Sequence, residues 1–326
     1  MTHDSSAGPC IHAEIAPKLN FACHQSAFPF LRRLQVENGA EETFLENVQV
    51  HLLADPGFLK PKTWHLDRIP PQGSVTVSDR DVQLDGRFLL GLTEAMRGTV
   101  TLRAEAGGEV LAESTHDVEL LAHNEWGGAG FMPELLAAFC VPNDRAVDRI
   151  LRDAADVLRR AGKSDAIDGY QAGSRARVWE IASAIYAAIA NLGLAYALPP
   201  TSFERDGQKI RLPGQILDGG VGTCLDTTLL FAAALEQAGL NPVIALPEGH
   251  AVVGVWLQPE DLTAIVIDEA ETLRKREQLQ ELIFIETTAV THHPAVSFTQ
   301  ATRAASRTLA PENDASFCAA VDIRRA

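Results

Sequence analysis

The chain has 326 residues, of which 46% are hydrophobic and 22% are charged, and its formal net charge is −15. This composition is typical of a soluble globular protein with room for two or three folded modules, and it excludes a disordered chain. A strongly acidic chain is poorly suited to binding a phosphate backbone, and no apolar run reaches the length of a membrane span. We therefore expect no nucleic acid and no membrane among its direct partners.

The cysteines indicate a reducing compartment. They are odd in number and widely spaced, with no Cys-X-X-Cys pair: Cys10, Cys23, Cys140, Cys224 and Cys318. This pattern favours free thiols over disulfides or structural zinc. The N-terminus lacks the basic and apolar regions of a secretory signal. We predict a cytoplasmic protein whose residues 1–10 are flexible.

Residues 11–122 have the pattern of a β domain. Val48, Val50 and Leu52 alternate with polar residues, as in a half-buried strand. Further short strands are expected at 75–77 and 98–104, and turn signals lie between the strands. This spacing predicts an immunoglobulin-like β-sandwich with no helix before residue 110.

The histidines of this β domain are scattered. They show no metal-ligand spacing, and we interpret them as surface or strand-edge residues: His12, His24, His51, His65 and His116. The glycine-rich segment 123–130 then predicts a linker. After it the hydrophobic period becomes helical, and helices are expected over 146–161 and 175–192. These helices form the connector to the rest of the chain.

A cysteine lies at the start of the next helix. Thr223 and Asp226 have the spacing of a capping box, so Cys224 is expected at the first helical position of a buried helix that runs to Gly239. The unpaired N–H groups and the helix dipole there favour the thiolate, which is the nucleophilic form. A lone cysteine is more often packing material, so further residues must support a catalytic role.

A histidine and two acids follow this helix. His250 lies at the start of a predicted strand over 249–257. Asp268 ends the apolar run 264–267, and Glu286 ends a later apolar strand, so two acids compete for a third position. A cysteine, an imidazole and an orienting acid form the set that nucleophilic catalysis on a carbonyl requires. The backbone N–H of Cys224 and the side chain of Gln215 are candidate oxyanion donors.

The order of these elements resembles the core of the transglutaminase-like superfamily, whose papain-like triad runs Cys, His, then Asp or Glu. The resemblance covers roughly residues 170–290, and it implies that residues 131–300 form a transglutaminase-like cysteine hydrolase domain. The fold class is therefore expected to be α+β, with a sandwich, a helical connector and a papain-like core. The family pattern of an acid followed by Thr favours Glu286, with Asp268 as the alternative third member.

The resemblance also implies a function. The segments Gly-Thr-Cys-Leu-Asp and Gly-His-Ala are similar to a module near the N-terminus of large bacterial helicase-like proteins, some of them linked to antiviral defence. It implies a cysteine protease or amidase that cleaves a peptide or isopeptide bond of a peptide or protein substrate. The alternative is a weakly active or inactive binding and regulatory module of a larger helicase-type ATPase.

Two expectations complete the sequence analysis. Residues 301–326 are expected to form a C-terminal segment that ends in a helix and leads into a downstream ATPase domain. The pair His292-His293 is followed by Pro294 and has no nearby Cys or acid at structural-site spacing. We therefore expect no metal and no cofactor.

Overall fold

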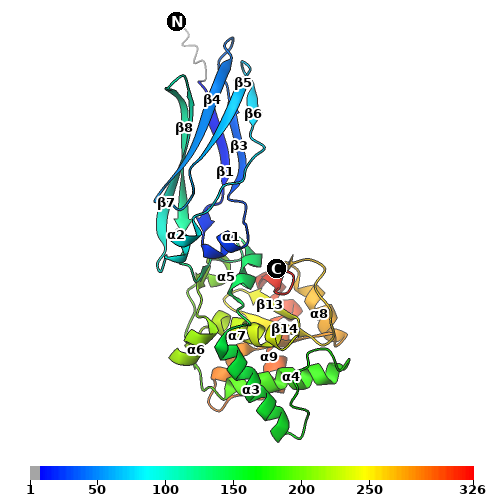
Figure 1. The fold of residues 1–326 in the computed structure, drawn as a ribbon. Helices are drawn as coiled ribbons and strands as arrows, with labels where there is room; N and C mark the ends of the chain where they lie inside the picture. The colour runs from blue at the N-terminus through cyan, green and yellow to red at the C-terminus, as the bar shows by residue number, and fades with distance from the viewer. Residues whose placement is uncertain (1–7) are drawn as a thin grey trace. The chain divides into compact units, whose positions relative to one another are not determined.

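The computed structural model of the protein describes residues 8–326. The chain forms two compact units, one ending at Asn124 and one beginning at Glu125. Helices make up 33% of the structure and strands 29%, in several sheets, which confirms the predicted α+β class (Figure 1). Residues 1–7 of the expected flexible N-terminus lie outside the described residues, and Cys10 already begins a strand.

The first unit contains eight strands among its described residues. They are β1 (Cys10–Ile15), β2 (Lys18–Leu19), β3 (Leu31–Glu37), β4 (Leu45–Asp55), β5 (Lys62–Ile69), β6 (Ser74–Thr76), β7 (Met96–Ala106) and β8 (Glu109–Leu120). One sheet has the order β1-β3-β6, and the other has the order β2-β8-β7-β4-β5. All neighbouring strands are antiparallel except β2 and β8. Val48, Val50 and Leu52 are fully buried, as the alternation along β4 predicts.

Two single-turn helices in the first unit were not expected. They are α1 (Phe21–Gln25) and α2 (Gly86–Leu90). Asn20 caps the first, and Asp85 caps the second by accepting a hydrogen bond from the backbone N–H of Phe88 at 3.0 Å. A helix of five residues is too short to show a 3.6-residue hydrophobic period, so these polar caps are its main sequence signal.

The second unit combines helices with a central sheet. Its helical segments are η1 (Pro133–Phe139), α3 (Arg145–Arg160), α4 (Arg175–Ala190), α5 (Phe203–Asp206), α6 (Pro213–Gly219), α7 (Cys224–Gln237), α8 (Ala270–Gln278), η2 (Thr287–Thr291), α9 (Phe298–Thr308) and η3 (Pro311–Ser316). Its strands are β9 (Glu125–Trp126), β10 (Ala195–Tyr196), β11 (Gln208–Lys209), β12 (Val221–Gly222), β13 (Pro242–Pro247), β14 (Val252–Trp256), β15 (Val266–Ile267), β16 (Leu282–Ile285) and β17 (Phe317–Asp322).

The central sheet and one buried helix form the core of the second unit. The sheet is antiparallel and has the order β15-β17-β13-β14-β16. Helix α7 packs on β13 and β14, and its residues Cys224 through Leu235 are all buried. A helix that is apolar on every side is stable only when it is buried on every side. The first turn of α7 is thus fixed within the packed core of the second unit.

The end of the chain is a strand, where we expected a helix. Strand β17 lies between β13 and β15 in the central sheet, and Ala319, Ala320 and Val321 are buried. A short apolar run that is covered on both faces has no period that distinguishes a strand from a helix. Residues 301–326 therefore belong to the second unit, to which they contribute most of α9 and all of β17.

The boundary between the two units falls inside the segment 123–130, where we expected a linker, but residues 125–130 are folded into the second unit. Strand β9 pairs with β11, and Trp126 is fully buried. Gly128 has a φ of +85°, and a Cβ there would lie 2.0 Å from the carbonyl oxygen of Arg205. The glycine therefore permits a close backbone approach, which a sequence pattern does not distinguish from flexibility.

No helix within residues 8–326 is long and apolar enough to cross a lipid bilayer.

Candidate functional site

Cys224 is the first residue of α7, and the helix start has the capping box predicted from the sequence. The Thr223 hydroxyl accepts a hydrogen bond from the backbone N–H of Asp226 at 3.2 Å. The Asp226 carboxylate accepts one from the backbone N–H of Thr223 at 3.0 Å. These two bonds fix the backbone on both sides of Cys224, so the direction of its side chain is set by the helix start.

Asp226 also connects the Cys224 turn to the preceding segment. Its carboxylate is fully buried and accepts hydrogen bonds from the backbone N–H and from Nη1 of Arg211, at 2.8 and 2.9 Å. The side-chain amide of Gln208 donates to the Thr223 hydroxyl at 3.0 Å. Gln208 is itself buried, and its Oε1 has no hydrogen-bond partner among residues 8–326. This polar side chain therefore lies beside the residue that precedes Cys224.

His250 lies immediately before β14 and is bonded to a glutamate. Its Nε2 donates to Oε2 of Glu286 at 2.7 Å, and its ring lies close enough to the Cys224 thiol for that group to raise the pKa of the ring. Because Nε2 is occupied by Glu286, Nδ1 is the nitrogen left for Cys224. The other oxygen of Glu286 accepts hydrogen bonds from the backbone N–H and the hydroxyl of Thr288, at 3.0 and 2.6 Å. The glutamate is thus held on both oxygens while it orients the ring.

The electrostatics of this set favour a protonated His250 and an ionised Glu286. Burial alone would lower the pKa of His250, but the hydrogen bonds and charges of Cys224 and Glu286 outweigh it and raise the pKa to about 10. Burial would raise the pKa of Glu286, yet the bond and charge of His250, helped by Thr288, hold it below its usual range. At neutral pH the imidazole therefore keeps its proton beside the ionised carboxylate of Glu286.

A cluster of threonines holds the three segments of the site together. The hydroxyl of Thr287 lies 3.0 Å from those of Thr227 and Thr228 on α7. Thr228 also donates to the carbonyl oxygen of Ala251 at 3.2 Å. The cluster thereby ties the first turn of α7 to the residue after the histidine and to the residue after the glutamate. The sequence analysis singled out only Thr287, as the Thr that follows Glu286, because only the fold brings Thr227 and Thr228 to it.

Tyr196 is a further member of the site that the sequence analysis missed. It lies on β10, whose parallel pairing with β12 sets Tyr196 beside Gly222. Its phenol lies close enough to Cys224 for the thiol to influence the charge state of the phenol. Burial first, and then the charge and hydrogen bond of Cys224, raise the pKa of Tyr196 to about 12, so the phenol keeps its proton. Cys224 itself is 0% exposed in this arrangement.

Two of the sequence candidates lie away from Cys224. Asp268 follows β15, at the opposite edge of the central sheet from β16 and Glu286, and it is exposed to solvent. Asp268 is therefore not the third member of the site, because the strand order separates it from His250. Gln215 is exposed on α6, and its side-chain oxygen accepts a hydrogen bond from the backbone N–H of Leu212 at 2.9 Å. The Gln215 side chain therefore caps the N-terminus of its own helix.

The structure thus brings three predicted residues together in one site. Cys224 begins a helix, and His250 and Glu286 lie at the adjoining ends of β14 and β16, which are neighbours in the sheet. A sulfur, an imidazole and a carboxylate in this order can carry out nucleophilic attack on a carbonyl. No family model matches the chain, and no curated protein matches its sequence. The functional assignment therefore rests on the geometry of these three side chains.

Proposed function

We propose that the protein is a cysteine hydrolase, a protease or amidase that cleaves a peptide or isopeptide bond. The observation that carries the proposal is the arrangement of Cys224, His250 and Glu286, in which Nε2 of His250 donates to Glu286 at 2.7 Å and Cys224 helps to raise the pKa of the imidazole. Packing alone does not require a partly buried imidazole between a thiol and a carboxylate that is itself held on both oxygens. Strongly shifted pKa values in such a set are typical of functional sites.

The site geometry supports a two-step acyl transfer. The Cys224 sulfur attacks the carbonyl carbon, and the proton on His250 passes to the leaving amine as the carbon–nitrogen bond breaks. The neutral imidazole then takes a proton from water, whose oxygen attacks the acyl-enzyme and releases the acid and the thiolate. The backbone N–H of Cys224 has no acceptor within its own helix, so it is available to the oxyanion.

The arrangement of elements supports the finer fold assignment that we also propose. A cysteine helix packs on an antiparallel sheet, with the histidine strand β14 next to the acid strand β16. This is the order of elements in the transglutaminase-like, papain-like core described above. The two sheets of the first unit support an immunoglobulin-like sandwich.

A specific observation favours a second candidate function. Cys224 is fully buried and lies near Tyr196, so the sulfur has no open path to a substrate in this conformation. A module of this kind can serve as a weakly active or inactive binding element that regulates a helicase-type ATPase, for example in a bacterial antiviral defence protein. In that case its partner is a peptide or protein that binds without being cleaved.

Digestion of a defined peptide mixture tests the first function against the second. We expect new peptide termini with the wild-type chain and none with Cys224→Ala. The same reaction with an added primary amine separates hydrolysis from transfer, because a transferase leaves amine-tagged glutamines. If wild type and Cys224→Ala give the same peptides, the hydrolase proposal is rejected and the binding module is favoured.

Removal of Tyr196 is expected to expose the sulfur. In Tyr196→Ala, alkylation of Cys224 by iodoacetamide should be faster than in wild type, because both the phenol hydroxyl and the ring near the sulfur are gone. Tyr196→Phe, which keeps the ring, should fall between the two. Leu198→Ala is the matched control, since Leu198 lies two residues away and is 86% exposed. Peptide mass spectrometry of timed samples gives the rates, and equal rates in all four proteins would contradict a covering role.

A further inference from the structure

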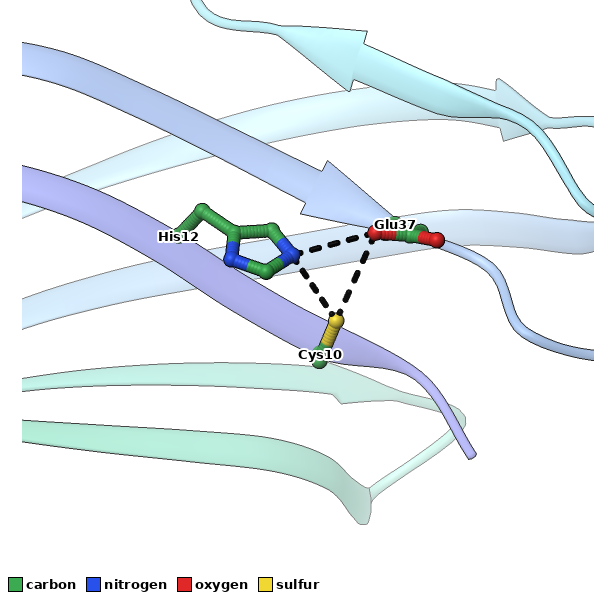
Figure 2. Close-up of side chains that lie close together, drawn as sticks. All are labelled: Cys10, His12 and Glu37. Atoms are coloured by element: carbon green, nitrogen blue, oxygen red, sulfur yellow. Dashed lines mark hydrogen bonds and ion pairs between the residues drawn. The ribbon is translucent and has the colours of Figure 1, made fainter. Parts of the chain in front are cut away.

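A second group of reactive side chains lies in the first unit, apart from the proposed active site. Cys10 and His12 are on β1, and Glu37 ends β3 (Figure 2). The Cys10 sulfur lies 3.1 Å from Nε2 of His12 and 3.7 Å from Oε2 of Glu37. The same Nε2 and Oε2 atoms are 3.0 Å apart. The sulfur, the nitrogen and the oxygen therefore lie together, and Figure 2 shows the three side chains meeting at one place.

The strand geometry explains why these residues meet. Residues two apart on a strand project from the same face, which puts Cys10 beside His12. Glu37 is directly opposite Cys10 in the antiparallel register of β1 and β3. Opposed residues have their Cβ atoms about 4.5–5.5 Å apart, close enough for their side chains to share a ligand. The sequence analysis treated His12 as an isolated surface residue, because its acidic neighbour comes from another strand.

We propose that Cys10, His12 and Glu37 form a zinc site with three protein ligands and one position open to solvent. Zinc bonds are about 2.3 Å to sulfur and 2.0–2.2 Å to nitrogen and oxygen, so tetrahedral ligands lie about 3.3–3.6 Å apart. The three observed separations differ from these values by less than about half an ångström. Small side-chain rotations are sufficient to admit the ion.

The donor set and its exposure suit this ion. A thiolate, an imidazole and a carboxylate are the three side-chain donors that zinc uses in proteins. The side chains of His12 and Glu37 are 54% and 48% exposed, so the ion and a water molecule have access. Among residues 8–326, this is the one group of three such residues whose ligand atoms all lie within 4.8 Å of one another. The site is independent of the proposed hydrolase function.

Metal binding at this site should release a proton. Partial burial, together with the charge and hydrogen bond of Glu37, raises the pKa of the Cys10 thiol. Without metal, the three groups therefore share hydrogen bonds, and the thiol must lose its proton when the ion binds. The apparent affinity should accordingly fall as the pH is lowered. A bound ion would also link the first strand of the unit to β3 and would raise the melting temperature of the chain.

Cobalt titration of the untagged full chain, in a reducing buffer without chelators, tests the site. We expect one Co²⁺ per chain with thiolate-to-metal charge-transfer absorption, and displacement of the Co²⁺ by Zn²⁺. Cys10→Ser should remove this absorption, and His12→Ala and Glu37→Gln should each weaken binding at least about tenfold. His51→Ala is the matched control, because His51 lies 3.9 Å from Glu105 in the same unit but outside the proposed site.

Two results would overturn the proposal. One is the absence of charge-transfer absorption in the wild-type chain. The other is a charge-transfer absorption that persists in Cys10→Ser. If that absorption is then lost in Cys224→Ser, the metal binds at Cys224 and not at Cys10. Melting curves without metal establish that each variant is folded. If Cys10→Ser does not fold, Glu37→Gln provides the test. Zinc should no longer raise the melting temperature of this variant, and a rise equal to that of wild type rejects the site.

Discussion

Replacement of Glu286 by Gln is expected to lower kcat/KM by about 10²–10⁴-fold. The carboxylate fixes the orientation of the His250 ring through a 2.7 Å bond and stabilises the imidazolium form. A glutamine side chain has nearly the same shape but carries no charge, so the loss reports on the charge and on the tautomer of the ring. The assay is cleavage of a peptide identified with the wild-type chain.

The pH profile of this variant distinguishes positioning of His250 from a general structural role. The bond and charge of Glu286 raise the pKa of His250, so its loss moves that pKa down. Activity that depends on the imidazolium is lost as the pH rises through this pKa. The alkaline limb of the rate profile should therefore shift to lower pH in Glu286→Gln. A uniform loss at every pH would argue against this role.

Asp268→Asn is the matched control for Glu286→Gln. Asp268 is the other acid that the sequence offered, and it is exposed at the far edge of the sheet. Its replacement should leave kcat/KM within about a factor of two, as for most surface substitutions. A large loss in Asp268→Asn with normal activity in Glu286→Gln would contradict the proposed triad.

Part of the candidate site could be predicted from the sequence, because two of its signals lie within a few neighbouring residues. The capping residues Thr223 and Asp226 place Cys224 at a helix start, and this pattern lies within four residues. The structure has this helix start as predicted. His250 was identified from its position at the start of a predicted apolar strand, although the structure begins this strand two residues later, at Val252. Local patterns of this length do not depend on the rest of the fold.

The remaining features depend on which strands are neighbours. Asp268 and Glu286 both follow apolar strands, and only the sheet order puts Glu286 next to His250. Tyr196 reaches Cys224 through a two-residue parallel pairing that leaves no hydrophobic period. The same reason explains why the C-terminal strand was taken for a helix. Pairing across a sheet is set by packing between distant segments, and a single sequence carries little trace of it.

Replacement of Asp226 by Ala is expected to lower the free energy of unfolding of the second unit by about 2–4 kcal/mol. The fully buried carboxylate accepts hydrogen bonds from the backbone N–H groups of Thr223 and Arg211. Alanine leaves both donors without these acceptors and removes half of the capping box. The Arg211 side chain is 42% exposed, so its guanidinium can turn to solvent, which limits the loss.

Calorimetry of the full chain measures this effect, because the two units can melt separately. For a unit of this size the loss corresponds to a decrease in melting temperature of roughly 4–16 °C. Asp226→Asn should lie between Asp226→Ala and wild type, since an amide oxygen keeps part of the bonding. Asp218→Ala, at an exposed position on α6, should change stability by no more than about 0.5 kcal/mol.

Cys224→Ala separates stability from chemistry in the same experiment. It keeps the capping box, so its melting temperature should stay close to that of wild type while cleavage is lost. Asp226→Ala should lose both, because the turn that directs the sulfur toward His250 is no longer fixed. If Asp226→Ala melts like wild type, the capping box is not what holds the start of α7. The orientation of Cys224 would then have to come from the threonine cluster around Thr287.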